Sequence, residues 1–129
     1  MNRTVYCGYV IEAEGSAVYF AGDTAHADFF KQLSEKFSID VALLPIGAYR
    51  PRSWFKHIHM SPEDAVQAFI DLKAKHFVPI HWGTFKISDE PMREPPILLR
   101  QVAELARRGG QAGITEQIHM LKNGGRFGW

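Results

Sequence analysis

Strand-like runs of β-branched and aromatic residues alternate with segments of helical periodicity, and this alternation most constrains the fold. The strand-like runs are residues 5–12, 17–21, 40–47, 77–80 and 118–121. Hydrophobic residues recur at helical spacing in residues 25–37, from Pro62 to about Leu72, and in residues 97–108. Strands that alternate with helices predict one mixed α/β sheet carrying about three helices.

The sequence marks the start of one helix clearly and leaves the start of another open between two residues. Ser61 is a good N-cap, Pro62 suits the first helical position, and Glu63 and Asp64 favour the positive end of the helix dipole. For the helix in residues 25–37 we expect the cap at Asp23 or Thr24. Residues 48–60 are predicted to form a loop.

Length and charge limit the classes of function. The 129 residues fit one domain, 1–129, and the net charge of +1 gives no case for binding nucleic acid or an anionic membrane surface. Apolar runs are shorter than the 18 residues that a membrane helix needs. The single cysteine, Cys7, is expected in the core of a strand and suits a reducing compartment, so we predict a cytoplasmic protein without a signal peptide.

Polar side chains follow three of the predicted strands directly. Asp23 follows the strand ending at Ala21, Tyr49 and its loop follow the strand ending at Gly47, and His81 follows Ile80. In α/β sheets, functional groups collect beyond the carboxyl ends of strands. We therefore expect the site at this edge.

Two interpretations remain open for Asp23 and for His81. Asp23 could bind one metal ion or bridge two, or it could serve only as a helix N-cap. His81 could be a zinc ligand at the end of a buried strand, or a buried histidine bonded to backbone.

The loop between residues 48 and 60 combines histidine, basic and aromatic residues. His57 and His59 would point to the same side if the segment were extended, as half of a metal site or as surface or substrate-binding histidines. Arg50, Arg52 and Lys56 flank two aromatic residues, which suits a phosphate-bearing or amphipathic substrate. A solvated loop or a partner interface fits the same pattern equally well.

Five motifs in order resemble a known family. They are Gly22-Asp23-Thr24, Leu44-Pro45-Ile46-Gly47-Ala48-Tyr49-x-Pro51-Arg52, His59-x-x-Pro62-Glu63-Asp64-Ala65, Ile80-His81-Trp82-Gly83-Thr84-Phe85 and Glu94-Pro95-Pro96. Together they resemble the C-terminal half of the N-acylphosphatidylethanolamine-hydrolysing phospholipase D branch of the metallo-β-lactamase superfamily. The resemblance covers nearly the whole chain.

The resemblance implies an αββα sandwich with two zinc ions between its sheets. Asp23 matches the bridging aspartate of the family, and His81 matches its last histidine ligand. His59 matches a catalytic histidine near the substrate and the nucleophilic water. Thr24 and Trp82 then support the two ligands, and we expect Tyr49, Arg50 and Arg52 to contact the substrate.

One departure from the family decides what this chain can do alone. The H-x-H-x-D-H motif, which supplies most of the zinc ligands, and a further histidine before the Gly-Asp-Thr strand do not occur in the sequence. Two protein ligands are too few for a stable zinc site. We therefore predict an inactive half-domain with an uncovered inner sheet face, which forms a homodimer or pairs with an N-terminal half-domain.

Two functions follow. The first is the C-terminal part of a zinc-dependent hydrolase, a phosphodiesterase acting on phospholipid-like or other phosphoester substrates. The second is a non-catalytic, self-associating module derived from the same fold.

Overall fold

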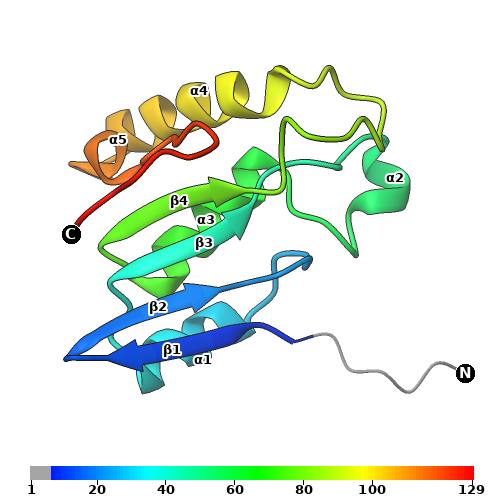
Figure 1. Ribbon diagram of the computed structural model, residues 1–129. Helices are drawn as coiled ribbons and strands as arrows, with labels where there is room; N and C mark the ends of the chain where they lie inside the picture. The colour runs from blue at the N-terminus through cyan, green and yellow to red at the C-terminus, as the bar shows by residue number, and fades with distance from the viewer. Residues whose placement is uncertain (1–6) are drawn as a thin grey trace, which may run out of the picture.

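The computed structural model describes residues 7–129, which form one mixed sheet of four strands in the order β1-β2-β3-β4 (Figure 1). The strands are β1 (Tyr9–Ala13), β2 (Ser16–Phe20), β3 (Val41–Pro45) and β4 (His76–Ile80). β1 and β2 form an antiparallel hairpin, whereas β2, β3 and β4 run parallel. The predicted α/β class and the mixed sheet are therefore confirmed. Residues 5 and 6 of the first predicted strand lie outside the described part.

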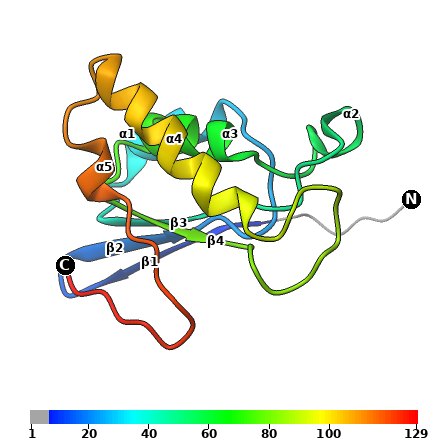
Figure 2. The ribbon, with the colours of Figure 1, turned by 90° about the horizontal axis from the view of Figure 1, so that it is seen from above.

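The helices cover one face of the sheet. They are α1 (Phe29–Lys36), α2 (Arg52–Phe55), α3 (Pro62–Leu72), α4 (Glu94–Arg108) and α5 (Ile114–Gln117). Seen from above, α1, α3 and α4 lie on one side of the sheet, and the C-terminal tail passes on the other side (Figure 2). Between Cys7 and Trp129 we find no helix long and apolar enough to cross a membrane.

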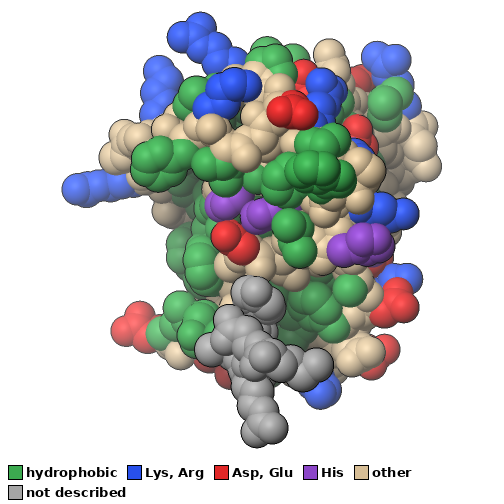
Figure 3. Space-filling view, turned by 90° about the vertical axis from the view of Figure 1, so that its right-hand side faces the viewer, with side chains coloured by type: hydrophobic (Ala, Val, Ile, Leu, Met, Phe, Trp, Pro, Cys, Tyr) green, Lys and Arg blue, Asp and Glu red, His purple; other side chains and the backbone are tan. Residues whose placement is uncertain are grey.

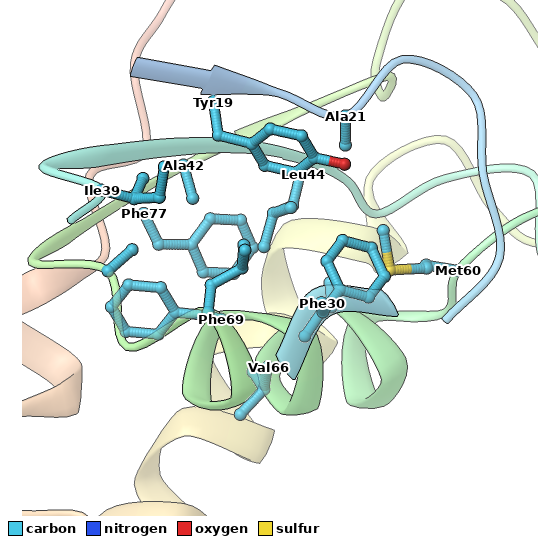
Figure 4. Packing of buried hydrophobic residues seen from close by; sticks show 14 of the residues in the cluster. Tyr19, Ala21, Phe30, Ile39, Ala42, Leu44, Met60, Val66, Phe69 and Phe77 are labelled. Atoms are coloured by element: carbon cyan, nitrogen blue, oxygen red, sulfur yellow. The ribbon is translucent and has the colours of Figure 1, made fainter. Parts of the chain in front are cut away.

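The core lies between the sheet and these helices (Figure 4). Phe77 of β4 stacks on Phe69 of α3 with ring centroids 5.5 Å apart, and Tyr19 of β2 meets Phe30 of α1 edge to face. Side chains alternate across a strand, so every second residue of β2, β3 and β4 points into this layer. Burial of these side chains supplies the main stabilisation of the fold.

Helix α3 begins where the sequence predicts. The Ser61 hydroxyl accepts a hydrogen bond from the Asp64 N–H, and the Asp64 carboxylate accepts one from the Ser61 N–H, which forms a capping box. Pro62 occupies the first turn, where its missing N–H costs nothing.

Three sequence-based expectations were wrong in detail. Helix α1 begins at Phe29 rather than near residue 25, because residues 24–28 form a loop tied to α3 by a bond from His26 to Asp71. Residues 118–121 are not a strand, since only Ile118 forms a bridge with Phe77 before the chain turns away. Cys7 is exposed because it precedes the first paired residue of β1.

Two smaller differences concern helix limits. The segment 48–60 is not wholly loop, because residues 52–55 form one helical turn, α2. Helix α4 begins three residues before the predicted start at residue 97, with two prolines in its first turn, where proline is tolerated.

The second face of the sheet is apolar and is exposed over β1 and the end of β2, whereas Val41 of β3 and Val78 of β4 are buried on it. Tyr9 and Ile11 of β1 and Phe20 of β2 are 58%, 59% and 38% exposed. Ile11 pairs with Val18, which pairs with Val41, so these side chains share the face opposite Tyr19. We refer to this surface, on which Tyr9, Ile11, Val18, Phe20, Val41, Leu43, Val78 and Ile80 lie, as the open face.

The C-terminal tail covers part of the open face. The His119 N–H donates to the Phe77 carbonyl oxygen, and its ring lies 3.0 Å, nitrogen to nitrogen, from His76 of β4. Phe127 stacks on His119 at 3.9 Å between centroids. The tail therefore lies over the amino end of β4 and leaves β1 and β2 uncovered (Figure 2).

Candidate metal and hydrolytic site

Asp23 and His81 meet at the carboxyl edge of the sheet. Asp23 lies just beyond β2 and His81 just beyond β4, and the strand that separates them, β3, brings Gly47 and Ala48 between their loops. Figure 3 looks onto this edge and shows histidine side chains gathered near its middle, with an acidic side chain beside them and hydrophobic ones around.

The distance between the two side chains suits a shared metal ion better than a hydrogen bond. Asp23 Oδ1 lies 3.4 Å from His81 Nε2. That is long for a hydrogen bond between nitrogen and oxygen, which is usually 2.7–3.2 Å. Two ligands of a tetrahedral zinc ion, each bonded at about 2.0–2.1 Å, would lie about 3.4 Å apart. The pair therefore has the spacing of two ligands of one ion.

Backbone conformation holds His81 in place. Its φ of 59° is left-handed, which is uncommon outside glycine and frequent at functional sites. The carbonyl oxygen of His81 lies against Gly47, where any Cβ would collide with it. Glycine at position 47 thus lets the loop after β3 contact the end of β4.

His59 lies directly beside His81. Their rings are nearly parallel, with centroids 5.2 Å apart. Burial, followed by the neighbouring His81, lowers the pKa of His59 and favours its neutral form. The Nδ1 atoms of both rings are buried and make no hydrogen bond with any residue that the structure describes. Such unpartnered polar atoms are costly unless something else binds them.

His57 does not join this group. Residues 56–58 form a turn rather than an extended segment, and the His57 side chain is exposed. The expectation that His57 and His59 point to the same side was therefore wrong. Of the two histidines, His59 alone reaches the site. It is the last residue of the turn, where its N–H donates a hydrogen bond to the Phe55 carbonyl oxygen.

The three expected substrate contacts are engaged within the chain. The buried Tyr49 donates its hydroxyl to Glu94 at 2.6 Å, and Arg50 forms an ion pair with the same carboxylate at 2.9 Å. Arg52 forms an ion pair with Asp64 at 2.6 Å. Each guanidinium keeps further N–H donors, but a phosphate bound there would share the arginine with that carboxylate.

The two expected supporting residues act through the backbone. The Thr24 hydroxyl donates to the Ala25 carbonyl oxygen, and the Trp82 indole N–H donates to the Pro79 carbonyl oxygen. Both bonds hold the chain beside a candidate ligand, and neither side chain bonds to Asp23 or His81. They therefore fix the loops and not the ligand side chains.

Three polar contacts were not anticipated from the sequence. Glu90 accepts hydrogen bonds from the loop at residues 48–50, His26 bonds Asp71, and His76 faces His119. Each joins residues at least 40 positions apart, so no local spacing signals it. A cavity of about 280 Å³ adjoins His81 and extends between Ala48 and the loop that leads to Glu90.

Comparison with known proteins identifies the family. Residues 1–82 match the Beta-lactamase superfamily domain. The chain belongs to the metallo-β-lactamase superfamily. It is 35% identical over 106 residues to the N-acyl-phosphatidylethanolamine-hydrolyzing phospholipase D 1 of Caenorhabditis elegans, covering 80% of this chain and 30% of that protein. It is 39% identical over 118 residues to a metal-dependent hydrolase of Thermus thermophilus, covering 91% and 43%.

A solved metallo-hydrolase structure matches nearly the entire fold. The metallo hydrolase Igni18 of Ignicoccus hospitalis superposes with a TM-score of 0.70 at 30% identity, covering 99% of this chain and 48% of that protein. The chain thus spans less than half the length of each of these relatives. The resemblance inferred from the five motifs is confirmed, as is the metallo-β-lactamase fold.

The residues present fit part of a superfamily metal site. A carboxylate oxygen and an imidazole nitrogen converge at the spacing of two metal ligands, and both are ligands that zinc accepts. Within residues 7–129, however, no group of three or more His, Cys, Asp or Glu side chains is placed to hold a metal ion. A metal-dependent hydrolase needs further ligands beside this pair.

Proposed function

We propose that this chain is the C-terminal part of a zinc-dependent hydrolase, with phosphoesters of a phospholipid-like or simpler kind as its substrates. The observation that carries the proposal is the 3.4 Å separation of Asp23 Oδ1 and His81 Nε2. The similarity to metal-dependent hydrolases and to a phospholipase D supports it. Zinc is inferred from the ligand types and from the family resemblance.

In the proposed site each residue has a definite part. Asp23 and His81 would hold metal, with Asp23 shared between two ions as the family resemblance implies. Bound zinc would supply Lewis acidity and activate water near neutral pH. His59, beside the His81 ring and with a free Nδ1, would orient the substrate or transfer a proton.

Contact with the substrate is a smaller part of this proposal than the sequence suggested for Tyr49, Arg50 and Arg52. The Arg50 side chain is about half exposed and lies at the edge of the loop, so it could still attract a phosphate at long range. Its direct contact would compete with Glu94, as that of Arg52 would compete with Asp64.

The remaining metal ligands would come from a second half-domain that packs on the open face. Tyr9, Ile11 and Phe20 present an apolar surface there, and the relatives are more than twice as long as this chain. A half-domain bearing the H-x-H-x-D-H ligands is the favoured partner, and a second copy of the chain is the alternative. The cytoplasmic location stays a prediction from the single cysteine.

The experiment that tests this function joins the chain to a half-domain bearing H-x-H-x-D-H and assays hydrolysis of a generic phosphodiester with and without zinc. We expect turnover that requires zinc and falls at least a hundredfold in His59→Ala. The matched control is His57→Ala, since His57 is exposed and outside the site. A folded, zinc-loaded assembly without hydrolase activity would refute the proposal.

A non-catalytic, self-associating module is the second candidate. The apolar open face favours it, together with the small number of metal ligands within residues 7–129. It predicts a stable dimer whose assembly is unchanged in the double variant Asp23→Ala and His81→Ala. Sedimentation of the purified chain, with and without that change, tests this dimer, and the zinc-dependent assay of the assembled protein separates the two functions.

A further inference from the structure

Glu90 is a buried carboxylate that bonds to three consecutive backbone N–H groups. It is 5% exposed. Its Oε1 accepts from the N–H of Ala48 at 2.7 Å and of Tyr49 at 3.3 Å, and its Oε2 accepts from the N–H of Arg50 at 3.0 Å. The Ser88 hydroxyl donates to Oε1 at 2.7 Å. A buried charge with so many donors is well compensated, and it fixes every group that it bonds.

These bonds close a ring of backbone around the candidate site. Gly47 contacts the His81 carbonyl oxygen, and the chain then runs from His81 through the loop to Glu90. Glu90 returns to Ala48, the residue after Gly47, whose φ of 63° is left-handed. The Asp89 N–H adds a bond to the Arg50 carbonyl oxygen at 3.2 Å. The loops after β3 and β4 are thereby tied together at both ends.

The cavity beside His81 lies within this ring. Gly47, Ala48, His81 and Glu90 line it, together with the intervening loop from Trp82 to Ser88. That loop has no regular secondary structure, and Phe85 and Ile87 on it are exposed. The Glu90 carboxylate supplies the side-chain hydrogen bonds that join residues 48–50 to the end of this loop, beside the backbone bond from Asp89 to Arg50.

The three N–H groups also form an anion-binding arrangement of the kind that holds phosphates in other proteins. Here the Glu90 carboxylate fills it. The donors at residues 48–50 are therefore occupied from within the chain and do not face a substrate phosphate.

We propose that Glu90 is a positioning residue: its carboxylate occupies the anion-binding backbone of residues 48–50 and thereby holds the cavity beside His81 in the shape that receives the substrate. The cavity's role rests on the proposed hydrolase function. The hydrogen-bond network around Glu90 does not rest on that function, so the network and the hydrolase function can be refuted separately.

The first test is chemical rescue, read by NMR on the chain itself. Glu90→Ala removes the carboxylate and should shift the amide resonances of Ala48, Tyr49 and Arg50 together. Formate or acetate should restore them by entering the vacated position, whereas chloride at the same ionic strength should not. Glu104→Ala, which removes an exposed carboxylate of α4, is the matched control and should leave these amides unchanged. Unmoved amides in Glu90→Ala would overturn the proposal.

The second test is kinetic and uses the chain assembled with its ligand-bearing half-domain. Glu90→Ala should lower kcat/KM by on the order of tenfold to a hundredfold, mainly through a higher KM, with unchanged zinc content. Formate should recover part of the loss. A purely structural role would lower the amount of folded enzyme, and hence the apparent kcat, with KM unchanged. That result would overturn the positioning role.

A milder variant covers the case in which Glu90→Ala does not fold. Ser88→Ala removes one donor to the same carboxylate and should shift the same three amides by less, with a smaller rise in KM. Unchanged amides would count against the network. If the wild-type assembly binds zinc but hydrolyses nothing, the proposed function fails, whereas the amide shifts still decide whether Glu90 binds this backbone.

Discussion

The two faces of the sheet are both apolar, yet the helices cover one of them and the tail covers only the β3 and β4 part of the other. On the helix side, Phe77 and Leu44 are fully buried under α3 and α1. On the open face, Tyr9 and Ile11 remain more than half exposed, although they lie in a paired strand. The difference separates what the chain needs for its own stability from what it offers to a second layer.

The site lies at the border between these two regions, which explains why it is only partly formed. Asp23, His59 and His81 are held by loops whose backbone is anchored on the covered side, through Gly47 and the α3 capping box. The unpartnered Nδ1 atoms of His59 and His81 lack bonding groups within residues 7–129. A second layer on the open face would bring new groups to the same edge.

The largest expected effect is on the covered face. Phe77→Ala should lower the free energy of unfolding by about 3–5 kcal/mol, because it removes a fully buried ring that stacks on Phe69. Urea denaturation followed by circular dichroism measures this loss. A change below about 1 kcal/mol would mean that the covered face is not the principal core.

A smaller effect is expected where the tail covers the open face. Phe127→Ala should cost about 1 kcal/mol, because it removes the stacked contact with His119 and the edge contact with His76. The same denaturation experiment applies, with Trp129→Ala as a control because Trp129 is exposed and contacts only Phe127 among the aromatic rings described. Equal losses in both variants would contradict the specific stack.

Acid should weaken the same tail contact. Burial, followed by the neighbouring His76, lowers the pKa of His119 below its ordinary 6.5. The unfolded chain therefore binds a proton at higher pH than the folded chain, so this stability is present above pH 6.5 and is lost as pH falls through the lowered pKa. Asp40 lies beside His76, and its hydrogen bond from Lys75 lowers the pKa of the Asp40 carboxyl. The pH dependence of unfolding should lose this component in His119→Gln, and an unchanged profile would contradict it.

The smallest effect on stability is expected on the uncovered part of the open face. Ile11→Thr should change the free energy of unfolding of the isolated chain by less than about 0.5 kcal/mol, since the side chain is already exposed and threonine also suits a strand. It should, however, weaken association with the second half-domain or with another copy. Calorimetric titration of wild type and variant would show this, and equal association would argue that the open face is not an interface.

The sequence predicted the sheet and the main helices because their signals are local. The apolar run before Gly47 and the cap at Ser61 depend on neighbours within a few residues, and both are confirmed. The start of α1 was missed, and the loop that precedes it is bonded to α3 through His26 and Asp71, which lie 45 positions apart and give no local signal.

The sequence predicted which residues lie at the site, but not the hydrogen-bond and ion-pair partners of the surrounding loops. Asp23 and His81 both follow parallel strands whose carboxyl ends lie at one edge of the sheet, so their meeting was foreseeable even though β3 lies between those strands. The carboxylate partners of Arg50 and Arg52 depend instead on how distant loops fold back. The role of Glu90 could not be read from the sequence, because an isolated glutamate between Asp89 and Pro91 has no distinguishing pattern.

The most direct test of the account is zinc affinity, measured by calorimetric titration of the chain joined to a half-domain that bears the H-x-H-x-D-H ligands. Asp23→Asn and His81→Ala should each weaken binding by at least tenfold, because the first replaces an anionic carboxylate ligand by a weaker neutral amide and the second removes an imidazole ligand. Asp28→Asn, which changes a nearby exposed carboxylate that makes no capping bond, should bind as wild type does. Wild-type zinc affinity in both site variants would contradict the claim that Asp23 and His81 are ligands of a shared hydrolytic centre.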